Sequence, residues 1–396
     1  MNAKGEAWVR LGVVGVLLLG ALLLVSGCSS NTSSGTALPN QNIFVVQGGS
    51  VSTFPLTASG NAAPSGTLSG AHTGFTDAHR LAFDSLLNGY VTNCGSCVDE
   101  GLDSIMIYAP GTSGNTVPTA TISGAATGLS APFGIDLDAH NNIYVANDGG
   151  GAVLPSVAVY AAGSTGNVAP AVVISGADTG LDGPNGLALD SGANIYVANE
   201  SNSTVVVFAA GSAGDAAPLL TIVGAATGIS RPHDLTVDPG GNLYVTNSFN
   251  NSVTIYTAGD ISNAFTATLA CIAAFPPPPA PPPTPAQQAA CSVQDLVPGV
   301  TMVGAATALN NPNGIAFDAS GNFYVTNNLS GVMIYAASTI GAAITAYNTC
   351  ETGPPAKAPA ACKQTLDKAP VATITGADTG FEDVHGVSIQ QTQVLI

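Results

Sequence analysis

A Gly-Ala-x-Thr-Gly phrase recurs six times along this chain of 396 residues, and its spacing constrains the fold more than any other feature. The copies begin at Gly70, Gly124, Gly176, Gly224, Gly304 and Gly376, and the fifth copy departs from the phrase by ending in Thr307-Ala308. Successive copies lie 54, 52, 48, 80 and 72 residues apart, so the last two intervals contain insertions. A period of about 50 residues, with several short strands in each unit, is typical of a β-propeller.

Each repeat can be written as four short strands joined by turns, and residues 232–259 show three of them. Leu235–Val237, Asn242–Thr246 and Ser252–Tyr256 are separated by clusters of Asp, Asn, Pro, Gly and Ser. A fourth strand precedes each Gly phrase. Strands such as Asn-Ile-Tyr-Val-Ala are apolar on both faces, as expected when each sheet is covered on both sides. The sequence therefore predicts an all-β, six-bladed β-propeller of four-stranded antiparallel blades. The 47 Gly and 26 Pro argue against long helices.

The two ends of the chain supply the sixth blade. Val387–Ile389 matches a first strand, whereas Ser52–Leu56 and Gly66–Ser69 match a third and a fourth strand. Pairing the N- and C-terminal strands within one blade closes the ring and removes its open edges. Both Ile43–Val46 and Val394–Ile396 fit the missing second strand, and the sequence leaves these alternatives open.

The N-terminus has the features of a bacterial lipoprotein signal. Lys4 and Arg10 precede an apolar run over residues 11–25, and the run ends in Leu-Val-Ser-Gly-Cys28, which resembles a lipobox. We expect cleavage to leave Cys28 as a lipidated N-terminus that anchors the protein to a membrane. An ordinary signal peptide that ends near a Cys is the alternative. A lipid anchor predicts an extracytoplasmic protein on the outer membrane or the cell surface.

This gives a simple domain layout. We expect a signal peptide at 1–27, the lipidated Cys and a flexible tether at 28–41, and the propeller at 42–396, with a Pro-rich insertion at 260–297 and a second insertion at 338–368. The Pro-rich run from Pro276 to Pro285 predicts exposed polyproline II.

The charge of the chain excludes one class of partner. Its net charge is −17, and only seven residues are Lys or Arg. Because a phosphate backbone requires clustered cations, the sequence argues against nucleic acid as a partner. We expect a monomer that contacts a protein or a glycan.

Two motifs of the repeat resemble NHL-type six-bladed propellers. They are the Pro-x-Gly-(x)3-Asp pattern of the first strands and the Asn-x-Tyr-Val-x-Asn pattern of the second strands. The resemblance covers about residues 42–396. Relatives of that fold include gluconolactonase-type enzymes, streptogramin B lyase and peptide alpha-amidating lyase. The resemblance implies a fold more than an activity, because one architecture hosts many functions.

Six cysteines besides Cys28 fall into three close pairs. The pairs are Cys94 with Cys97, Cys271 with Cys291, and Cys350 with Cys362. In an exported protein we expect each pair to form a local disulfide. A redox role for the Cys-Gly-Ser-Cys motif at 94–97 is the alternative. It is disfavoured because a strand and a Gly-rich loop flank the motif in place of a helix N-terminus.

One position near the start of each first strand collects the histidines. In chain order it holds His79, Phe133, Asn185, His233, Asn313 and His385. Three of the five histidines stand there, and first strands are innermost in a propeller, so these side chains should ring one mouth of the central channel. Converging imidazoles suit a divalent metal such as Zn²⁺ or Ca²⁺, with Asn185, Asn313 and Phe133 lining a ligand site.

The resemblance to the amidating lyase assigns roles to some of these residues. It implies that His79, His233 and His385 are metal ligands, that Asp234 is a catalytic acid, and that Arg80 or Arg231 binds an anionic group. That enzyme takes its histidines from alternating blades, whereas here they come from blades one, four and six. The alternative is a polar rim without metal, since His and Asn suit the tight backbone before a strand.

Two classes of function follow. The first is a lipid-anchored propeller that acts as a binding scaffold for a protein or another ligand, and the second is a metal-dependent lyase or lactonase that uses the axial His/Asn ring. The sequence shows no Ser-His-Asp order and no Glu-rich pocket. It therefore favours the binding scaffold and leaves enzymatic activity open.

Overall fold

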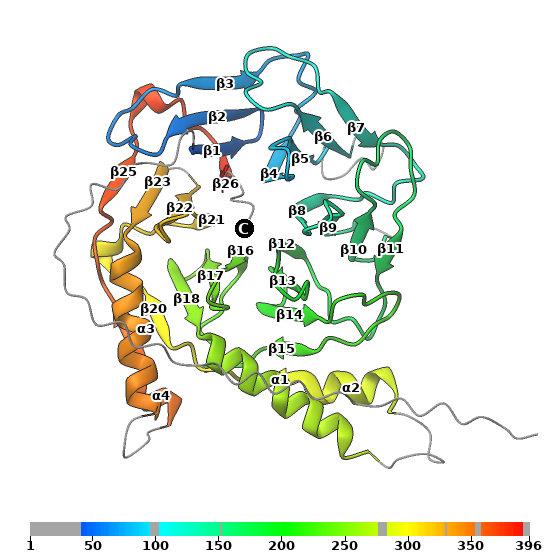
Figure 1. The fold of residues 1–396 in the computed structure, drawn as a ribbon, viewed down its shortest axis with the longest axis vertical. Helices are drawn as coiled ribbons and strands as arrows, with labels where there is room; N and C mark the ends of the chain where they lie inside the picture. Colours follow the sequence, from blue (N-terminus) through cyan, green and yellow to red (C-terminus); the bar gives the residue numbers. More distant parts are fainter. Residues whose placement is uncertain are drawn as a thin grey trace, which may run out of the picture. The chain divides into compact units, whose positions relative to one another are not determined.

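Six β-sheets surround a central axis in the computed structural model (Figure 1). The structure describes residues 41–95, 103–150, 153–275, 283–328, 331–352 and 358–390. Within them each sheet has four antiparallel strands, numbered here from the axis outward, and two sheets carry a fifth strand in parallel. The predicted all-β, six-bladed propeller is confirmed.

The blades follow one another in chain order. Blade 1 contains β4 (Ala78–Phe83), β5 (Gly89–Asn93), β6 (Ser104–Tyr108) and β7 (Ala120–Ser123). Blade 2 contains β8 (Pro132–Leu137), β9 (Ile143–Asn147), β10 (Ser156–Tyr160) and β11 (Val172–Ile174). Blade 3 contains β12 (Pro184–Leu189), β13 (Ile195–Asn199), β14 (Thr204–Phe208), β15 (Leu220–Ile222) and the added β19 (Val293–Gln294).

The second half of the ring repeats the pattern. Blade 4 contains β16 (Pro232–Val237), β17 (Leu243–Asn247), β18 (Ser252–Tyr256), β20 (Val300–Met302) and the added β24 (Gln364–Leu366). Blade 5 contains β21 (Pro312–Phe317), β22 (Phe323–Asn327), β23 (Gly331–Tyr335) and β25 (Ala372–Ile374). Blade 6 contains β26 (Val384–Ile389), β1 (Asn42–Gln47), β2 (Ser50–Pro55) and β3 (Gly66–Ser69).

Blade 6 closes the ring with strands from both ends of the chain. β1 pairs antiparallel with β26, with Ile43 opposite Ile389 and Val45 opposite Val387. Ile43–Val46 is therefore the missing second strand, and Val394–Ile396 lies outside the described residues. This pairing holds the two ends of the chain together in one blade and closes the ring.

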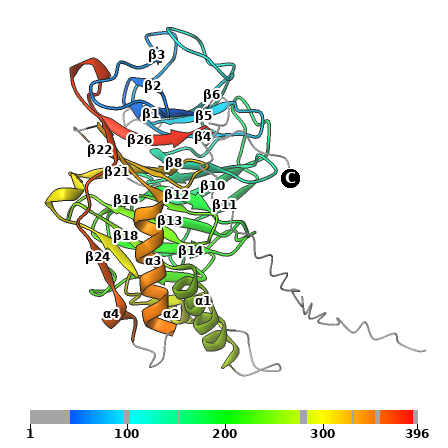
Figure 2. The same cartoon turned by 60° about the vertical axis from the view of Figure 1, so that its left-hand side comes forward.

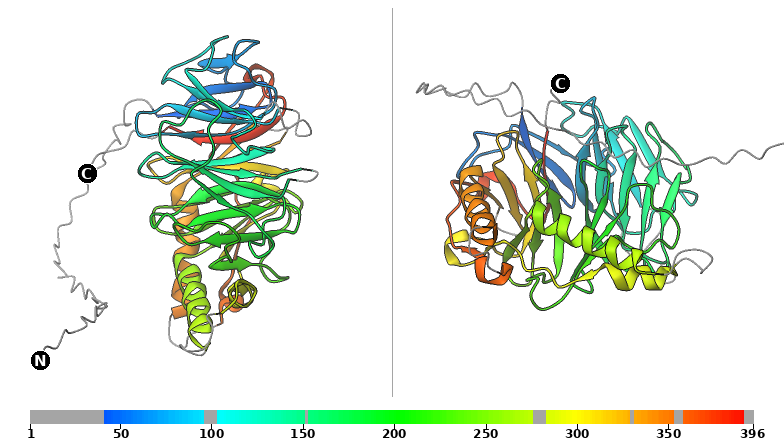
Figure 3. Two further views of the ribbon diagram at one scale, coloured as in Figure 1. Left: turned by 90° about the vertical axis from the view of Figure 1, so that its right-hand side faces the viewer. Right: turned by 60° about the horizontal axis from the view of Figure 1, so that its bottom comes forward.

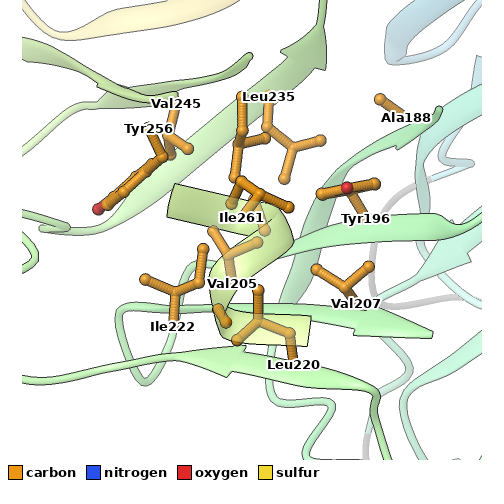
Figure 4. Packing of buried hydrophobic residues seen from close by; sticks show 13 residues of the cluster. Ala188, Tyr196, Val205, Val207, Leu220, Ile222, Leu235, Val245, Tyr256 and Ile261 are labelled. Carbon is orange, nitrogen blue, oxygen red and sulfur yellow. The ribbon is translucent and has the colours of Figure 1, made fainter. Parts of the chain in front are cut away.

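Apolar side chains fill the spaces between neighbouring blades. Between blades 3 and 4, Tyr196 and Val205 face Leu235 and Tyr256, and Ile261 closes the outer side (Figure 4). Tyr256 is fully buried, and its hydroxyl donates to the carbonyl of Thr227 at 2.7 Å. The apolar faces seen in the sequence are thus covered from both sides, and burial of this area supplies the main driving force for stacking.

The repeated Gly phrase fastens each blade to the next one. In all six copies the N–H of the third residue donates to an Asn or Asp side chain of the following blade, over 2.7–2.9 Å. The acceptors are Asn115, Asn167, Asp215, Asp295, Asp367 and Asn61. The phrase begins with Gly because a Cβ would meet the acceptor: at Gly124, where φ is +114°, it would lie 2.7 Å from Cγ of Asn167.

Both insertions form helical hairpins, so the expectation of no long helices is wrong. α1 (Ala258–Ala273) and α2 (Pro285–Ser292) follow β18, and α3 (Ala337–Thr352) and α4 (Pro359–Cys362) follow β23. The overall Gly and Pro content concealed local Ala-rich segments with good caps. α1 begins at Thr257 with a reciprocal capping box to Asp260. Of the Pro-rich run, residues 276–282 lie outside the described residues, so their polyproline conformation stays a prediction, and Pro285 begins α2.

The helices lie beside the ring on its outer side, next to blades 3 to 5 (Figure 1), and the turned views agree (Figure 2, Figure 3). Disulfides Cys271–Cys291 and Cys350–Cys362 lock the two hairpins, as predicted. The hairpins also contact each other, because the Tyr347 hydroxyl donates to Asp260 at 3.0 Å. Within the described ranges, no helix combines the length and the apolar character needed to cross a membrane.

Candidate functional site

The six ring residues occupy the second position of each inner strand. These strands are β4, β8, β12, β16, β21 and β26. Each strand starts at the end of its blade where the second strand ends and the third begins, as the pairing of Ala78 with Asn93 and of Asn93 with Ser104 shows in blade 1. The ring therefore lies on one face of the propeller, here called the ring face, together with the loops between second and third strands. The structure divides the ring into two clusters.

The first cluster joins blades 1 and 6. The rings of His79 and His385 meet edge to face with centroids 4.4 Å apart, and Phe133 packs on His79 at the same distance. Asp77 faces both histidines: one carboxylate oxygen lies 3.3 Å from Nε2 of His79 and the other lies 3.8 Å from Nε2 of His385. Asp383 lies 3.1 Å from the same Nε2 of His385.

Burial keeps the two histidines neutral. It lowers the pKa of His79, although the hydrogen bond and charge of Asp77 act in the opposite direction. It lowers the pKa of His385 to about 4, and the neighbouring His79 contributes to this shift. Burial alone would raise the pKa of Asp77, but hydrogen bonding and charge from His79 hold it below the ordinary value. At neutral pH two uncharged imidazoles thus face an ionised carboxylate.

The second cluster joins blades 3, 4 and 5 around Glu200. Its carboxylate accepts from Nδ2 of Asn185 at 3.2 Å and lies 3.4 Å from Nε2 of His233. Nδ1 of His233 contacts Oδ1 of Asn313 at 2.5 Å, and Nδ2 of Asn313 donates to the carbonyl of Val384. The hydrogen bond from His233 lowers the pKa of Glu200 to about 2, and Arg231 adds to the shift against the effect of burial.

Arg231 contacts this cluster from outside. Its guanidinium pairs with Glu200 while its side chain stays 59% exposed. Its φ is +48°, a left-handed conformation that costs a non-glycine residue about 1 kcal/mol. The equivalent residues Ala131, Gly183 and Asn311, each directly before a Pro, have the same left-handed conformation, so it belongs to the repeat.

A buried ion pair closes the channel beneath the ring. Arg80 reaches across the axis from blade 1 to blade 4, where its Nε lies 3.2 Å from Oδ2 of Asp234. The Arg80 guanidinium also donates to the carbonyls of His385, His79 and His233, at 2.6, 3.2 and 3.2 Å. Burial raises the pKa of Asp234, and Arg80 is the main opposing influence. The charged groups of Arg80 and Asp234 are thus directed toward each other and toward the backbone.

Glycines hold the other four places of this layer. They are Gly134, Gly186, Gly314 and Gly386. At each of them a Cβ would lie 2.5–2.7 Å from the backbone of the next inner strand. The inner strands therefore approach each other too closely for a side chain, and among the residues that the structure describes the Arg80–Asp234 pair fills the axis at this level.

Asp136 is a second acid on an inner strand, half-buried there, and it gives a test by pH. It accepts N–H bonds from Leu137 and Leu189 at 2.8 and 2.9 Å, yet burial raises its pKa from 3.8 to about 6. When the pH falls from 7.5 to 4.5, the folded protein binds this proton before the unfolded chain does. The wild-type free energy of unfolding should then rise, relative to Asp136→Asn, by about 2 kcal/mol. Denaturant titrations of both proteins at the two pH values measure this; parallel pH profiles would contradict it.

Exposed apolar residues stand on the ring-face loops around the two clusters. Phe249, in the loop after β17, is 76% exposed, and Leu154, in the loop before β10, is 63% exposed. The backbone N–H of Phe249 donates to the carbonyl of Ser230, which holds this loop against the turn before β16. The ring face thus combines a polar centre with apolar points around it.

The sequence named the ring but not the acids that organise it. His79 and His385 lie together as the spacing predicted, whereas His233 contacts Glu200 and Asn313; the three-histidine metal set stays a prediction. Asp77 and Asp383 each stand two residues before a ring histidine, a repeated Asp-x-His signal that could have been used. Arg80 and Asp234 also carried a signal, since they replace the Gly of the opening motif in two blades.

Cys94, at the edge of the ring face, is fully buried and disulfide-bonded. Its predicted partner Cys97 lies outside the described residues. Cys28 and the proposed signal lie outside them as well.

Comparison with known proteins agrees with this architecture. Residues 181–208 and 230–256, which contain three strands each of blades 3 and 4, match the family described as NHL repeat. No curated protein matches the chain in sequence. The protein is thus a six-bladed β-propeller that carries NHL repeats.

Two solved structures with TM-scores above 0.5 share the fold at low identity. A nidogen/laminin complex contains a chain that is 15% identical with a TM-score of 0.53, covering 89% of this chain and 100% of that one. A Bacteroides caccae protein of unknown function is 7% identical with a TM-score of 0.53, covering 89% and 99%. Streptogramin B lyase is 11% identical with a TM-score of 0.39, covering 75% and 71%. At these identities the likeness concerns the fold alone.

Proposed function

We propose that this NHL-repeat propeller is an extracytoplasmic binding scaffold, a monomer tethered to a membrane by a lipidated Cys28, and that its ring face binds a partner protein. One observation carries the proposal: polar ring side chains and exposed apolar loop residues share one face, above a channel closed by Arg80 and Asp234. A ligand can therefore be held at the mouth without passing through the ring.

Two disulfides support a location outside the cytoplasm, where oxidising conditions preserve them. The signal-like N-terminus and the lipobox at Cys28 support the anchor. Mass spectrometry of the mature protein tests this part: an N-terminus other than an acylated Cys28 would contradict it.

The composition of the ring face favours a protein over a glycan. Phe249 and Leu154 stand apart on different blades, so a partner that covers both must be broad, as protein interfaces are. Exposed aromatic residues and Arg are enriched at the centres of such interfaces, and Phe249 and Arg231 belong to one blade.

Site-specific photocrosslinking tests the proposal. A photoreactive phenylalanine analogue at Phe249 should crosslink a protein in intact cells, whereas the same group at Leu86 should not. Leu86 is an equally exposed residue, 74%, on the opposite face of blade 1. With the partner in hand, Phe249→Ser should weaken binding about tenfold or more and Leu86→Ser should not. Equal adducts from both positions would overturn the proposal, and adducts that only glycosidases remove would identify a glycan.

A metal-dependent lyase or lactonase is the second candidate function. What favours it is the convergence of Asp77, His79 and His385 at the mouth of the channel, where a bound cation could polarise an oxygen of a substrate. Activity of this kind should disappear with a chelator and return with Zn²⁺.

A further inference from the structure

We infer that Asp77, His79 and His385 form a transition-metal site of the two-histidine, one-carboxylate type at the edge of the ring. This set differs from the three-histidine set, because it replaces His233 with a carboxylate from the turn before β4. The inference concerns binding of the ion alone, and it does not depend on whether the ring face binds a protein.

The first argument is the convergence of ligand atoms. One ligand atom from each of the three residues lies within 4.8 Å of the other two. The two carboxylate–imidazole distances, 3.3 and 3.8 Å, are close to the separation of about 3.3 Å between ligands that are each about 2.0–2.2 Å from one ion. Small side-chain rotations would therefore complete the site.

The second argument is the state of the two imidazole nitrogens. Nε2 of His79 and Nε2 of His385 are both buried, and each faces a carboxylate: Asp77 lies 3.3 Å from the first, and Asp383 lies 3.1 Å from the second. His79 as a whole is 8% exposed. Two buried imidazole nitrogens directed at carboxylates are positioned to share one cation with them.

The third argument is charge. Asp383, 3.1 Å from Nε2 of His385, adds negative charge on the outer side. Two imidazoles and a carboxylate suit Zn²⁺ or Fe²⁺, whereas Ca²⁺ prefers an all-oxygen shell, so the site favours a transition metal over Ca²⁺.

The position of the site explains why the ion would be accessible. His385 and Asp77 are only partly buried, and their side chains are 16% and 35% exposed on the ring face. Arg80 closes the channel below, and Phe133 covers one side of His79. An ion held here would keep open positions toward the mouth, as catalytic and ligand-binding metal sites do.

The test uses the full chain purified in detergent, stripped with a chelator and titrated with Co²⁺ and Zn²⁺. We expect one equivalent of Co²⁺ to bind with visible d–d absorption, and Zn²⁺ to displace it. His385→Ala and Asp77→Asn should each weaken binding about 100-fold or more, because each removes a direct ligand. His140→Ala, which removes an exposed histidine from a turn of blade 2, should leave binding unchanged.

His233→Ala separates this site from the three-histidine alternative. We expect it to change the Co²⁺ affinity less than about threefold, since His233 contacts Glu200 and Asn313. Loss of binding in His233→Ala with binding retained in Asp77→Asn would overturn the assignment in favour of three histidines. Absence of stoichiometric Co²⁺ and Zn²⁺ binding in a wild-type protein that melts cooperatively would overturn it altogether. Photocrosslinking at Phe249 in stripped protein would still report on the scaffold function separately.

Discussion

Replacing Arg80 with Met should lower the free energy of unfolding by about 3–5 kcal/mol, because it leaves the Asp234 carboxylate buried without its counter-ion. The change also removes the donor to three backbone carbonyls at the axis, those of His385, His79 and His233. Chemical denaturation at pH 7 measures the loss. Arg231→Met is the matched control, since that Arg is largely exposed and its pair should contribute less than about 1 kcal/mol.

A double-mutant cycle shows whether the pair or the individual groups carry the effect. Arg80→Met combined with Asp234→Asn removes both charges, so its cost should be smaller than the sum of the two single costs by about 1.5 kcal/mol or more. Additive losses would contradict the account of a mutually dependent pair.

The pH dependence of the single variant gives a second check. Burial raises the pKa of Asp234 in the wild type, and Arg80 opposes the shift, so removing Arg80 should raise that pKa further. The folded variant then binds a proton at a higher pH than the unfolded chain does. The difference in the free energy of unfolding between the wild type and Arg80→Met should therefore become smaller as the pH falls from 7 to 5.

The ring could be predicted because repetition reveals equivalent positions. Six copies of one strand motif place His79, His233 and His385 at equivalent positions, and closure of the six blades into a ring brings His79 and His385 together. The acids that contact them are harder to predict: Glu200 follows a second strand, and Asp77 lies in a turn. Their side chains reach the ring only through the loop conformation, which the repeat does not determine. The Gly and Pro content did not predict the helices, because composition averages over the whole chain. Helix α1 depends instead on a local capping box at Thr257.

The Arg80–Asp234 pair shows a different limit. Both residues stand at glycine positions, which the alignment of repeats makes visible, but their contact depends on blades 1 and 4 being opposite each other. That relation exists only once six blades, and not five or seven, have closed. The sequence does not determine which segment forms the closing strand, because two segments are equally apolar. The pairing of Ile43 with Ile389 identifies it as β1.

Gly134→Ala should be among the most damaging single-methyl substitutions in the ring, with a loss of about 3 kcal/mol or more. A Cβ at this position would lie 2.5 Å from the carbonyl oxygen of Asn185 and 2.7 Å from the amide nitrogen of Leu187. Both atoms belong to the backbone of β12, so no side-chain rotation can relieve the contact, and blades 2 and 3 must separate at the axis.

Gly341→Ala in α3 is the control, because a Cβ there has nothing within 4 Å. The same substitution should raise stability by about 0.5–1 kcal/mol, since Ala is the better helix former. Thermal and denaturant unfolding of the two variants should therefore move in opposite directions from the wild type. If Gly134→Ala were tolerated like Gly341→Ala, the inner strands could not be in backbone contact. Backbone contact between the inner strands is also what explains the four glycines around the Arg80–Asp234 pair. That explanation would then fail as well.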